Sequence, residues 1–397
     1  MVQESIYKNI AIIGCGAAGG LAAVLLCKNP YNKVTAFDVK EPFSTLLPTG
    51  GGRCNLTNDE KDVREFVKNY PRGEKFLISV FSKFGQEKTR ELFKDLGIKT
   101  YVQEDKRVFP ISNSSQKTIQ TLNKHLETSN FKHIKEKVVS IKKEDKFVVK
   151  SEKEEYIFDY IIITTGGRGN GFELAKNLGH NIIEPKPSLC AIDVKENFLY
   201  ALSGLSFKNV EIQSKLGKKK LPTVYGDILF SHKAITGPAI FKVSALSAFD
   251  NIEELEMTIK LVDFSQDEIE KYIKENQKKI IKNVFSKFAP ESYINAILDE
   301  YKIDENKQTA QIKKQEKEVL KNSLLELRLH AKSRLKDSEI VTAGGVDLKE
   351  IDSKTMQSKL VEGLYLAGEV LNIDAYTGGF NLQNCWSTAY IATQNFN

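Results

Sequence analysis

The apolar residues of this chain occur in two patterns, short dense runs and helical spacing, which predict alternating strands and helices. Short, dense runs rich in β-branched residues, at 9–13, 34–38 and 159–165, are typical of buried strands. An apolar block at 20–27 and helically spaced apolar residues over 59–98 predict the intervening helices. Strands that alternate with helices in this way favour an α/β fold built on a parallel sheet.

The middle of the chain interrupts this alternation. Residues 188–262 carry short alternating segments, which predict a β-rich inserted domain. Residues 263–337 place Lys, Glu, Leu and Ile at helical spacing, which predicts a small helical insert. Because buried-type strands followed by glycines return afterwards, residues 1–187 and 338–397 are expected to form one discontinuous domain.

A glycine motif joins the first predicted strand to the first predicted helix. Residues 14–19 read Gly-Cys-Gly-Ala-Ala-Gly, which matches G-x-G-x-x-G in its required strand–turn–helix setting. There Gly14 permits the tight turn, Gly16 lets the backbone approach a pyrophosphate, and Gly19 lets the helix pack closely on the strand. Asp38 ends the second strand about 20 residues later, where an acidic side chain can bond a ribose diol. The combination predicts dinucleotide binding.

The composition is that of a globular protein. Of the 397 residues, 41% are hydrophobic and 28% are charged. No apolar run approaches the ~18 residues of a membrane span. The first strand follows Met1 so closely that a signal peptide has no room. We therefore expect a cytoplasmic protein that makes no membrane contact.

The charges and cysteines point away from nucleic-acid and metal sites. The net charge of +6 comes largely from Lys spread over helical faces, so nucleic acid is not an expected partner. The cysteines show neither a CxxC pair nor metal-ligand spacing, so we expect no disulfide and no metal. They are Cys15, Cys27, Cys54, Cys190 and Cys385. The sequence does not indicate an oligomeric state.

Further glycine-rich segments favour a flavin over a nicotinamide nucleotide. Residues 50–55 read Gly-Gly-Gly-Arg-Cys-Asn, which lets the backbone pass close to a flat ring. Strand ends at 165–167 and 368–369 offer glycines and an acid, and Gly378-Gly379 precede a predicted helix starting near Asn381. The positive end of that helix suits the N1/O2 edge of a reduced flavin. Any one of these segments alone would pass as an ordinary glycine turn, but together they favour an extended FAD.

With these motifs the chain resembles the BaiN/YhiN family of FAD-dependent flavoproteins, which includes aminoacetone-oxidase-like members. The resemblance covers most of the chain, and the nonapeptide at 50–58 and the C-terminal block are quite specific. The segments that match the family are residues 14–19, 50–58, 107–110, 165–167, 226–238, 341–346, 355–356, 363–369 and 378–383. The resemblance implies a Rossmann-like FAD domain interrupted by a β-barrel-like domain and a small helical domain.

The resemblance also implies a set of cofactor-binding residues. They are Gly14, Gly16, Ala17, Ala18 and Gly19 at the pyrophosphate, Asp38 at the adenosine ribose, and Arg53, Cys54, Asn55, Thr165, Gly166, Gly368, Glu369, Gly379, Phe380, Asn381 and Leu382 along the flavin. Five positions depart from the family pattern: Thr45 and Thr49 before the glycine loop, then Ala234, Asn372 and Asn384. The first two affect expected cofactor contacts, and Asn372 and Asn384 affect the flavin potential or the substrate pocket.

Few residues are candidates for proton handling. His232 precedes a helix of the inserted domain, which is expected to cover the flavin; a hydrogen-bonded structural histidine is the alternative. Tyr376 and Asp374 precede the Gly-Gly segment and are candidates to face the substrate. Cys54 beside the flavin is either a redox thiol or a packing residue, and no partner cysteine is near in sequence.

The resulting hypothesis is an FAD-dependent oxidoreductase that transfers a hydride between flavin and a small organic substrate. No nicotinamide fingerprint is visible, so NAD(P)H as electron donor would bind transiently at the flavin face. An oxidase that uses O₂ is the other version of this hypothesis. The alternatives are an RNA-modifying flavoenzyme and a non-enzymatic flavin-binding or electron-transfer protein.

Overall fold

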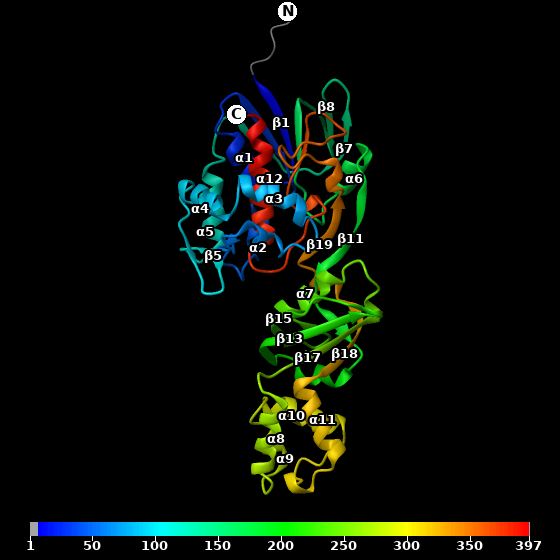
Figure 1. Cartoon of the computed structure of the whole chain (residues 1–397). Coiled ribbons are helices and arrows are strands. Elements are labelled where there is room, and N and C mark those ends of the chain that lie inside the picture. Colours follow the sequence, from blue (N-terminus) through cyan, green and yellow to red (C-terminus); the bar gives the residue numbers. More distant parts are fainter. Residues whose placement is uncertain (1–6, 397) are drawn as a thin grey trace, which may run out of the picture. The chain divides into compact units, whose positions relative to one another are not determined.

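The computed structural model describes residues 7–396, with Lys336 described by its backbone alone. It divides into two compact units. The first joins both ends of the chain, up to Lys186 and again from Thr342, and the second comprises Pro187–Val341. Figure 1 shows the elements of both units in sequence colours.

A parallel sheet forms the centre of the first unit. Its strand order is β20-β10-β1-β2-β6, and every neighbouring pair is parallel. The strands are β1 (Lys8–Ile13), β2 (Asn32–Phe37), β6 (Phe131–Ile134), β10 (Tyr160–Ile163) and β20 (Leu364–Leu366). Ile12 of β1 aligns with Ala36 of β2 and Ile162 of β10, and all three are fully buried. Uninterrupted apolar runs are expected of strands covered on both faces, and the predicted Rossmann-like fold is confirmed.

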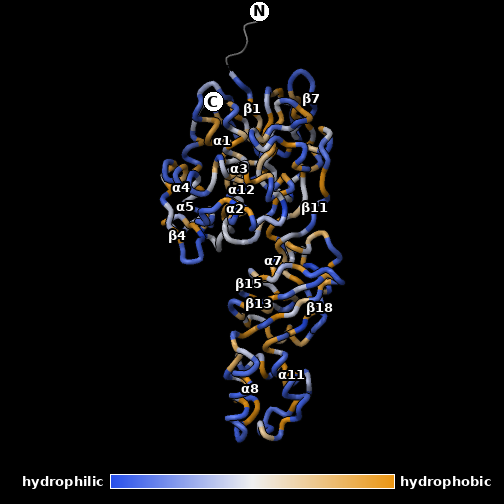
Figure 2. Tube along the Cα trace, in the orientation of Figure 1, coloured by the Kyte–Doolittle hydropathy of each residue, from blue (hydrophilic) through white to orange (hydrophobic). Residues whose placement is uncertain are grey.

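Helices and two small antiparallel sheets complete this unit. Helices α1 (Ala17–Leu26) and α12 (Phe380–Thr393) lie side by side, although they come from opposite ends of the chain (Figure 1). The other helices are α2 (Val63–Val67), α3 (Glu74–Lys83), α4 (Gln86–Asp95), α5 (Ser115–Lys124) and α6 (Gly171–Asn177). The small sheets are β3 (Thr57–Asn58), β5 (Arg107–Pro110) and β4 (Thr100–Val102), and β7 (Val138–Lys143), β8 (Phe147–Ser151) and β9 (Glu155–Phe158). The turn between β7 and β8 is hydrophilic (Figure 2).

The second unit is built on a closed antiparallel barrel. Six strands pair in the order β13-β15-β16-β12-β18-β17, and β17 pairs back to β13. These strands are β12 (Ile192–Val194), β13 (Ser206–Leu216), β15 (Val224–Phe230), β16 (Ile235–Thr236), β17 (Leu255–Lys260) and β18 (Leu327–Arg334), with β14 (Lys219–Lys220) added at the edge. Its helices are α7 (Pro238–Leu246), α8 (Gln266–Glu275), α9 (Ile281–Phe285), α10 (Glu291–Glu300) and α11 (Lys314–Leu325). The β-barrel expected from the family resemblance is therefore present.

One predicted helical stretch is wrong at its end. The helical spacing predicts a helical insert from 263 to 337, whereas helix α11 ends at Leu325 and β18 follows. Within β18, Leu327, Leu329 and Ala331 are buried and alternate with exposed residues. This period of two is a strand signal, and the barrel needs the strand because β18 joins β17 to β12.

Two strands, β11 (Ile182–Leu189) and β19 (Val341–Val346), pair where the chain passes between the units. Within the described residues, no helix combines the length and apolarity that crossing a bilayer requires.

Candidate functional site

The carboxyl ends of the central strands lie along one edge of the sheet. Strands β1, β2, β10 and β20 end at Ile13, Phe37, Ile163 and Leu366, and their neighbours align in register. The backbone pairing continues past these ends, because Gly14 N donates to Phe37 O at 2.8 Å. Ligands of open parallel sheets bind outside this edge. The predicted glycine and acidic residues that follow each strand are therefore brought together.

Gly14 and Gly19 lie where no side chain fits. Gly14 has a φ of +91°, and a Cβ there would lie 2.7 Å from Thr165 Cα. A Cβ on Gly19 would overlap the carbonyl oxygen of Gly14. Thr164 Oγ1 donates to that same oxygen at 2.6 Å and fastens the turn to β10. Glycine is thus required here by close backbone packing.

The first turn of α1 provides an open positive end. Gly16 precedes the helix, no side chain caps it, and no acidic residue lies in the first turn, where Ala17 and Ala18 follow. Asp38 lies beside this turn: its Oδ2 accepts from Cys15 N at 2.7 Å. Backbone N–H groups and the helix dipole favour a phosphate at such an end.

The Gly50–Gly52 loop has an unusual backbone. All three glycines and Cys54 adopt positive φ angles, and nothing lies within 4 Å of a Cβ placed on Gly51 or Gly52. The Arg53 guanidinium lies 4.2 Å from the centre of the Phe109 ring, and its Nε donates to Gly50 O at 3.3 Å. The loop therefore offers bare backbone and a held cation.

Asn55 ties this loop to the start of α12. With its amide oxygen towards Gly379, Asn55 accepts from Gly379 N at 3.0 Å and donates to Thr57 O at 3.0 Å. Gly379 has a φ of +98°, and a Cβ there would overlap the Thr57 backbone. Both contacts require the close approach of two segments that are distant in sequence.

The start of α12 resembles that of α1, because it has no side-chain cap and no acid in its first turn. Its side chains, however, are engaged with the protein. Asn381 Oδ1 accepts from Ala375 N and its Nδ2 donates to Ala375 O, both at 2.9 Å. Phe380 is buried and meets the Phe66 ring edge-on at 5.0 Å between centroids. Backbone groups and the half-buried Leu382 are what remain to meet a ligand.

The last strand end contacts both helices. Gly368 has a φ of +78°, and a Cβ there would lie 3.0 Å from Ala18 Cβ of α1. Its N–H donates to Thr388 Oγ1 of α12 at 2.9 Å. Glu369 follows, and its Oε2 lies 4.0 Å from the position of a Cβ on Gly166. The end of β20 therefore contacts the first turn of α1 and the middle of α12.

A family model described as HI0933-like protein Rossmann domain matches residues 8–395. The chain belongs to the HI0933-like family. This membership confirms the resemblance to the BaiN/YhiN flavoproteins, and the chain is an FAD-dependent oxidoreductase.

Similar proteins match over nearly their whole length. One named ribosomal RNA dihydrouridine synthase, from Haemophilus influenzae, is 29% identical, with 97% of each chain covered. One named 3-dehydro-bile acid delta(4,6)-reductase, from Clostridium scindens, is 27% identical, with 97% of this chain and 98% of that protein covered. A second ribosomal RNA dihydrouridine synthase, from Escherichia coli, is 24% identical, with 97% and 96% covered.

The candidate proton-handling residues of this HI0933-like protein fall into different places. Tyr376 is half-buried just before α12, and burial raises its pKa. Asp374 is fully buried and forms an ion pair with Arg72, so the prediction that Asp374 faces a substrate is wrong. His232 lies in the second unit, in the exposed turn between β15 and β16, and its role stays a prediction.

The surroundings of Cys54 disfavour a reactive thiol. Cys54 is fully buried, and burial raises the pKa of its thiol to about 12. A thiolate is the reactive form of cysteine, and this environment disfavours it.

Thr165, Asn372 and Asn384 have buried polar atoms without hydrogen-bond partners among the described residues. Thr165 Oγ1 is turned towards Gly171 and has no hydrogen-bond partner among the described residues, so only the Thr165 backbone faces the strand edge. Asn384 is 1% exposed, and within the described chain neither of its amide atoms is paired. Asn372 Oδ1 is likewise unpaired there. Buried polar atoms normally have partners, so the amides of Asn384 and Asn372 are exceptions among the described residues.

Sequence reasoning missed several residues that hold the site. Thr164 adjoins a predicted strand end, so its hydroxyl could have been found by asking what fixes Gly14. Thr57 Oγ1 donates to Gln383 Oε1 at 2.6 Å, which joins β3 to α12. Arg72 lies in a loop with no motif, and nothing in the sequence signals its pairing.

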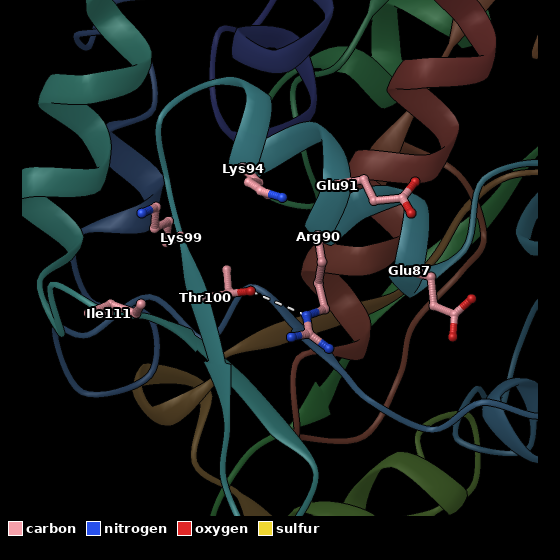
Figure 3. Close-up of a pocket in the computed structure, with 7 residues that line it drawn as sticks. All are labelled: Glu87, Arg90, Glu91, Lys94, Lys99, Thr100 and Ile111. Carbon is pink, nitrogen blue, oxygen red and sulfur yellow. Dashed lines mark hydrogen bonds between the residues drawn. The ribbon is translucent and has the colours of Figure 1, made fainter.

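Two surface cavities lie on the first unit, and neither contains a predicted site residue. One of about 450 Å³ lies between α4 and β4, where the Arg90 guanidinium points to Thr100, as Figure 3 shows, with a hydrogen bond of 3.2 Å. Its other lining residues are Glu87, Glu91, Lys94, Lys99 and Ile111. The second, of about 580 Å³, begins at Val39, directly after Asp38, and reaches α5.

Proposed function

We propose that this protein reduces a carbon–carbon double bond conjugated to a carbonyl group, using FAD. The observation that carries the proposal is the pair of uncapped helix N-termini, α1 and α12, in the unit that holds the strand edge. Two relatives with different names support it, because a 3-dehydro-bile acid delta(4,6)-reductase and a dihydrouridine synthase both saturate such a bond.

The residues at this edge fit FAD. The cradle excludes side chains at Gly14 and Gly19, and Asp38 is fixed beside the α1 turn. In this assignment the pyrophosphate lies at Gly14, Gly16, Ala17, Ala18 and Gly19, the ribose at Asp38, and the flavin along Arg53, Cys54, Asn55, the Thr165 backbone, Gly166, Gly368, Glu369, Gly379, Phe380, Asn381 and Leu382. When bound, the cofactor supplies the two-electron hydride chemistry.

The protein supplies orientation, charge and a proton. The α12 N-terminus places partial positive charge where a reduced ring carries negative charge. Tyr376 donates the proton that completes reduction of the double bond. A tyrosine phenol is protonated near neutral pH, so a proton is available at this position. Burial raises the pKa of Tyr376, so the proton is held more tightly than in an exposed tyrosine. His232 is the second candidate for this role.

The electron donor in this proposal is NAD(P)H, bound transiently at the flavin face. The substrate class favoured by the charge pattern is a small carbonyl-conjugated alkene, since Lys is spread over helical faces rather than gathered. A uridine in ribosomal RNA is the second candidate, and the names of two relatives favour it. Ribosomal RNA is therefore one of the substrates in the test.

Anaerobic flavin spectroscopy tests the proposal. The FAD-loaded protein is mixed with NADH or NADPH, and bleaching of the oxidised flavin band is followed. The reduced protein is then mixed with 2-cyclohexen-1-one, a 4,6-dien-3-one steroid, or a ribosomal RNA transcript. Reoxidation by one of these with formation of the saturated product is expected. A parallel anaerobic sample receives an amine instead of NAD(P)H, and air is admitted afterwards. Flavin reduction by the amine alone, followed by reoxidation in air, would replace the reductase proposal by an oxidase.

A further inference from the structure

A buried ion pair lies two residues before Tyr376. Nε and Nη2 of Arg72 donate to the two carboxylate oxygens of Asp374. Asp374 is fully buried, and the Arg72 side chain is 16% exposed. The backbones of the two residues also form an isolated antiparallel bridge. A planar guanidinium that meets a carboxylate with two parallel bonds fixes both position and orientation.

Further bonds hold the backbone around Tyr376. Its N–H donates to Asn69 O at 2.9 Å, and its carbonyl accepts from Asn381 Nδ2 at 3.4 Å. Asn69 is itself anchored, because its Nδ2 donates to Phe66 O at the end of α2. The segment that carries Tyr376 is thus clamped by the α2–α3 connection and by the first turn of α12.

We propose that Arg72 is a positioning residue for Tyr376: through its pair with Asp374 it fixes the loop that carries the phenol and sets the charge around it. This inference rests on the proposed role of Tyr376 as proton donor. Arg72 touches neither cofactor nor substrate in this account, and it acts through Asp374 and the loop.

The charges around the phenol make the pKa of Tyr376 a measurable test of the proposal. Burial raises the pKa of Tyr376, the Arg72 cation lowers it, and the Asp374 carboxylate raises it. Asp374→Asn removes the carboxylate but leaves the cation, so the titration midpoint of Tyr376 falls. The double variant Arg72→Gln/Asp374→Asn also removes the cation, so the midpoint returns upwards.

The experiment measures this midpoint directly in FAD-loaded protein. Tyrosines are replaced by 3-fluorotyrosine, and the ¹⁹F signal of residue 376 is assigned by its loss in Tyr376→Phe. The signal is titrated in wild type, Asp374→Asn and the double variant, whose two amides can still hydrogen-bond. Lys61→Gln is the matched control, since it removes a cation from an exposed ion pair of the same unit.

We expect a lower midpoint in Asp374→Asn, a return in the double variant, and no change in Lys61→Gln. A midpoint that is the same in Asp374→Asn as in wild type overturns the inference, and so does a double variant that matches Asp374→Asn. Because the titration needs no substrate, it is separate from the proposed function. Full product formation by Tyr376→Phe would instead show that Tyr376 does not donate the proton.

Discussion

The two helix starts at the strand edge, α1 and α12, expose the same chemistry and are built in different ways. At α1 the geometry comes from missing side chains: Gly14 and Gly19 let backbone pack on backbone. At α12 it comes from side chains supplied by distant segments: Asn55 meets Gly379, and Asn381 holds Ala375.

This difference separates local from long-range determinants of a cofactor cradle. The glycines of the α1 turn lie within six residues, and the backbone packs against Gly14 and Gly19 so closely that an added Cβ at either position should be severe. The α12 end depends on several hydrogen bonds and one ion pair, so its losses should be graded.

The largest effect is expected at the α1 turn. Gly19→Ala would place a Cβ where the Gly14 carbonyl oxygen lies. Because this oxygen belongs to the backbone of the same turn, it cannot simply move away. We expect a loss of more than about 5 kcal/mol in the free energy of unfolding, and no retained FAD. Gly51→Ala is the control: its Cβ meets nothing within 4 Å, and only its φ of +66° costs about 1–2 kcal/mol. Equal losses in both variants, measured by urea unfolding, would contradict the packing account.

The second largest effect is expected at the Arg72–Asp374 ion pair, two residues before Tyr376. Arg72→Gln leaves the Asp374 carboxylate buried without its cation, which should cost about 3–5 kcal/mol. Thermal melts with added FAD measure the change. Lys61→Gln should cost little, because both partners of that pair are exposed. A melting temperature of Arg72→Gln within the range of that control would show that the pair does not hold the loop.

Two neighbouring threonines allow a finer comparison at the α1 end. Thr164→Val removes the hydroxyl that donates to Gly14 O and should cost about 1–3 kcal/mol in unfolding free energy. Thr165→Val removes a hydroxyl without a partner among the described residues and should be nearly neutral. Denaturant midpoints of the two variants decide the matter, and the reverse ranking would refute the assigned hydrogen bond.

The smallest effect is the loss of stability between pH 9 and about pH 10, roughly 1.4 kcal/mol. The pKa of Cys54 is raised from 9.0 to about 12 by burial, so the folded state holds its proton longer than the unfolded chain. Stability from this group is complete below pH 9.0 and is lost as the pH rises through about 12. Cys54→Ala should therefore lose less stability between neutral and alkaline pH than wild type, as measured by urea midpoints. Parallel decline in both proteins would remove Cys54 as the cause.

Features that follow from local sequence patterns could be predicted from the sequence, and features that depend on contacts between distant residues could not. The α1 turn, Asp38 and the parallel sheet could be read because their signals are local spacing and uninterrupted apolar runs. The pairing of Arg72 with Asp374 could not, because ion pairs between residues far apart leave no periodic signal. Strand β18 was missed because its alternation is short and follows a long helical region. The engagement of the Phe380 and Asn381 side chains also depends on partners from elsewhere in the chain.

The central claim is that one extended FAD lies along the edge from Asp38 to the start of α12. A crystal structure of the protein grown with FAD tests it most directly. The account predicts adenosine density beside Asp38, pyrophosphate density at the first turn of α1, and ring density against the backbone of Gly379–Leu382. FAD density that meets only one of the two helix starts, or none in a protein that retains FAD in solution, would contradict it.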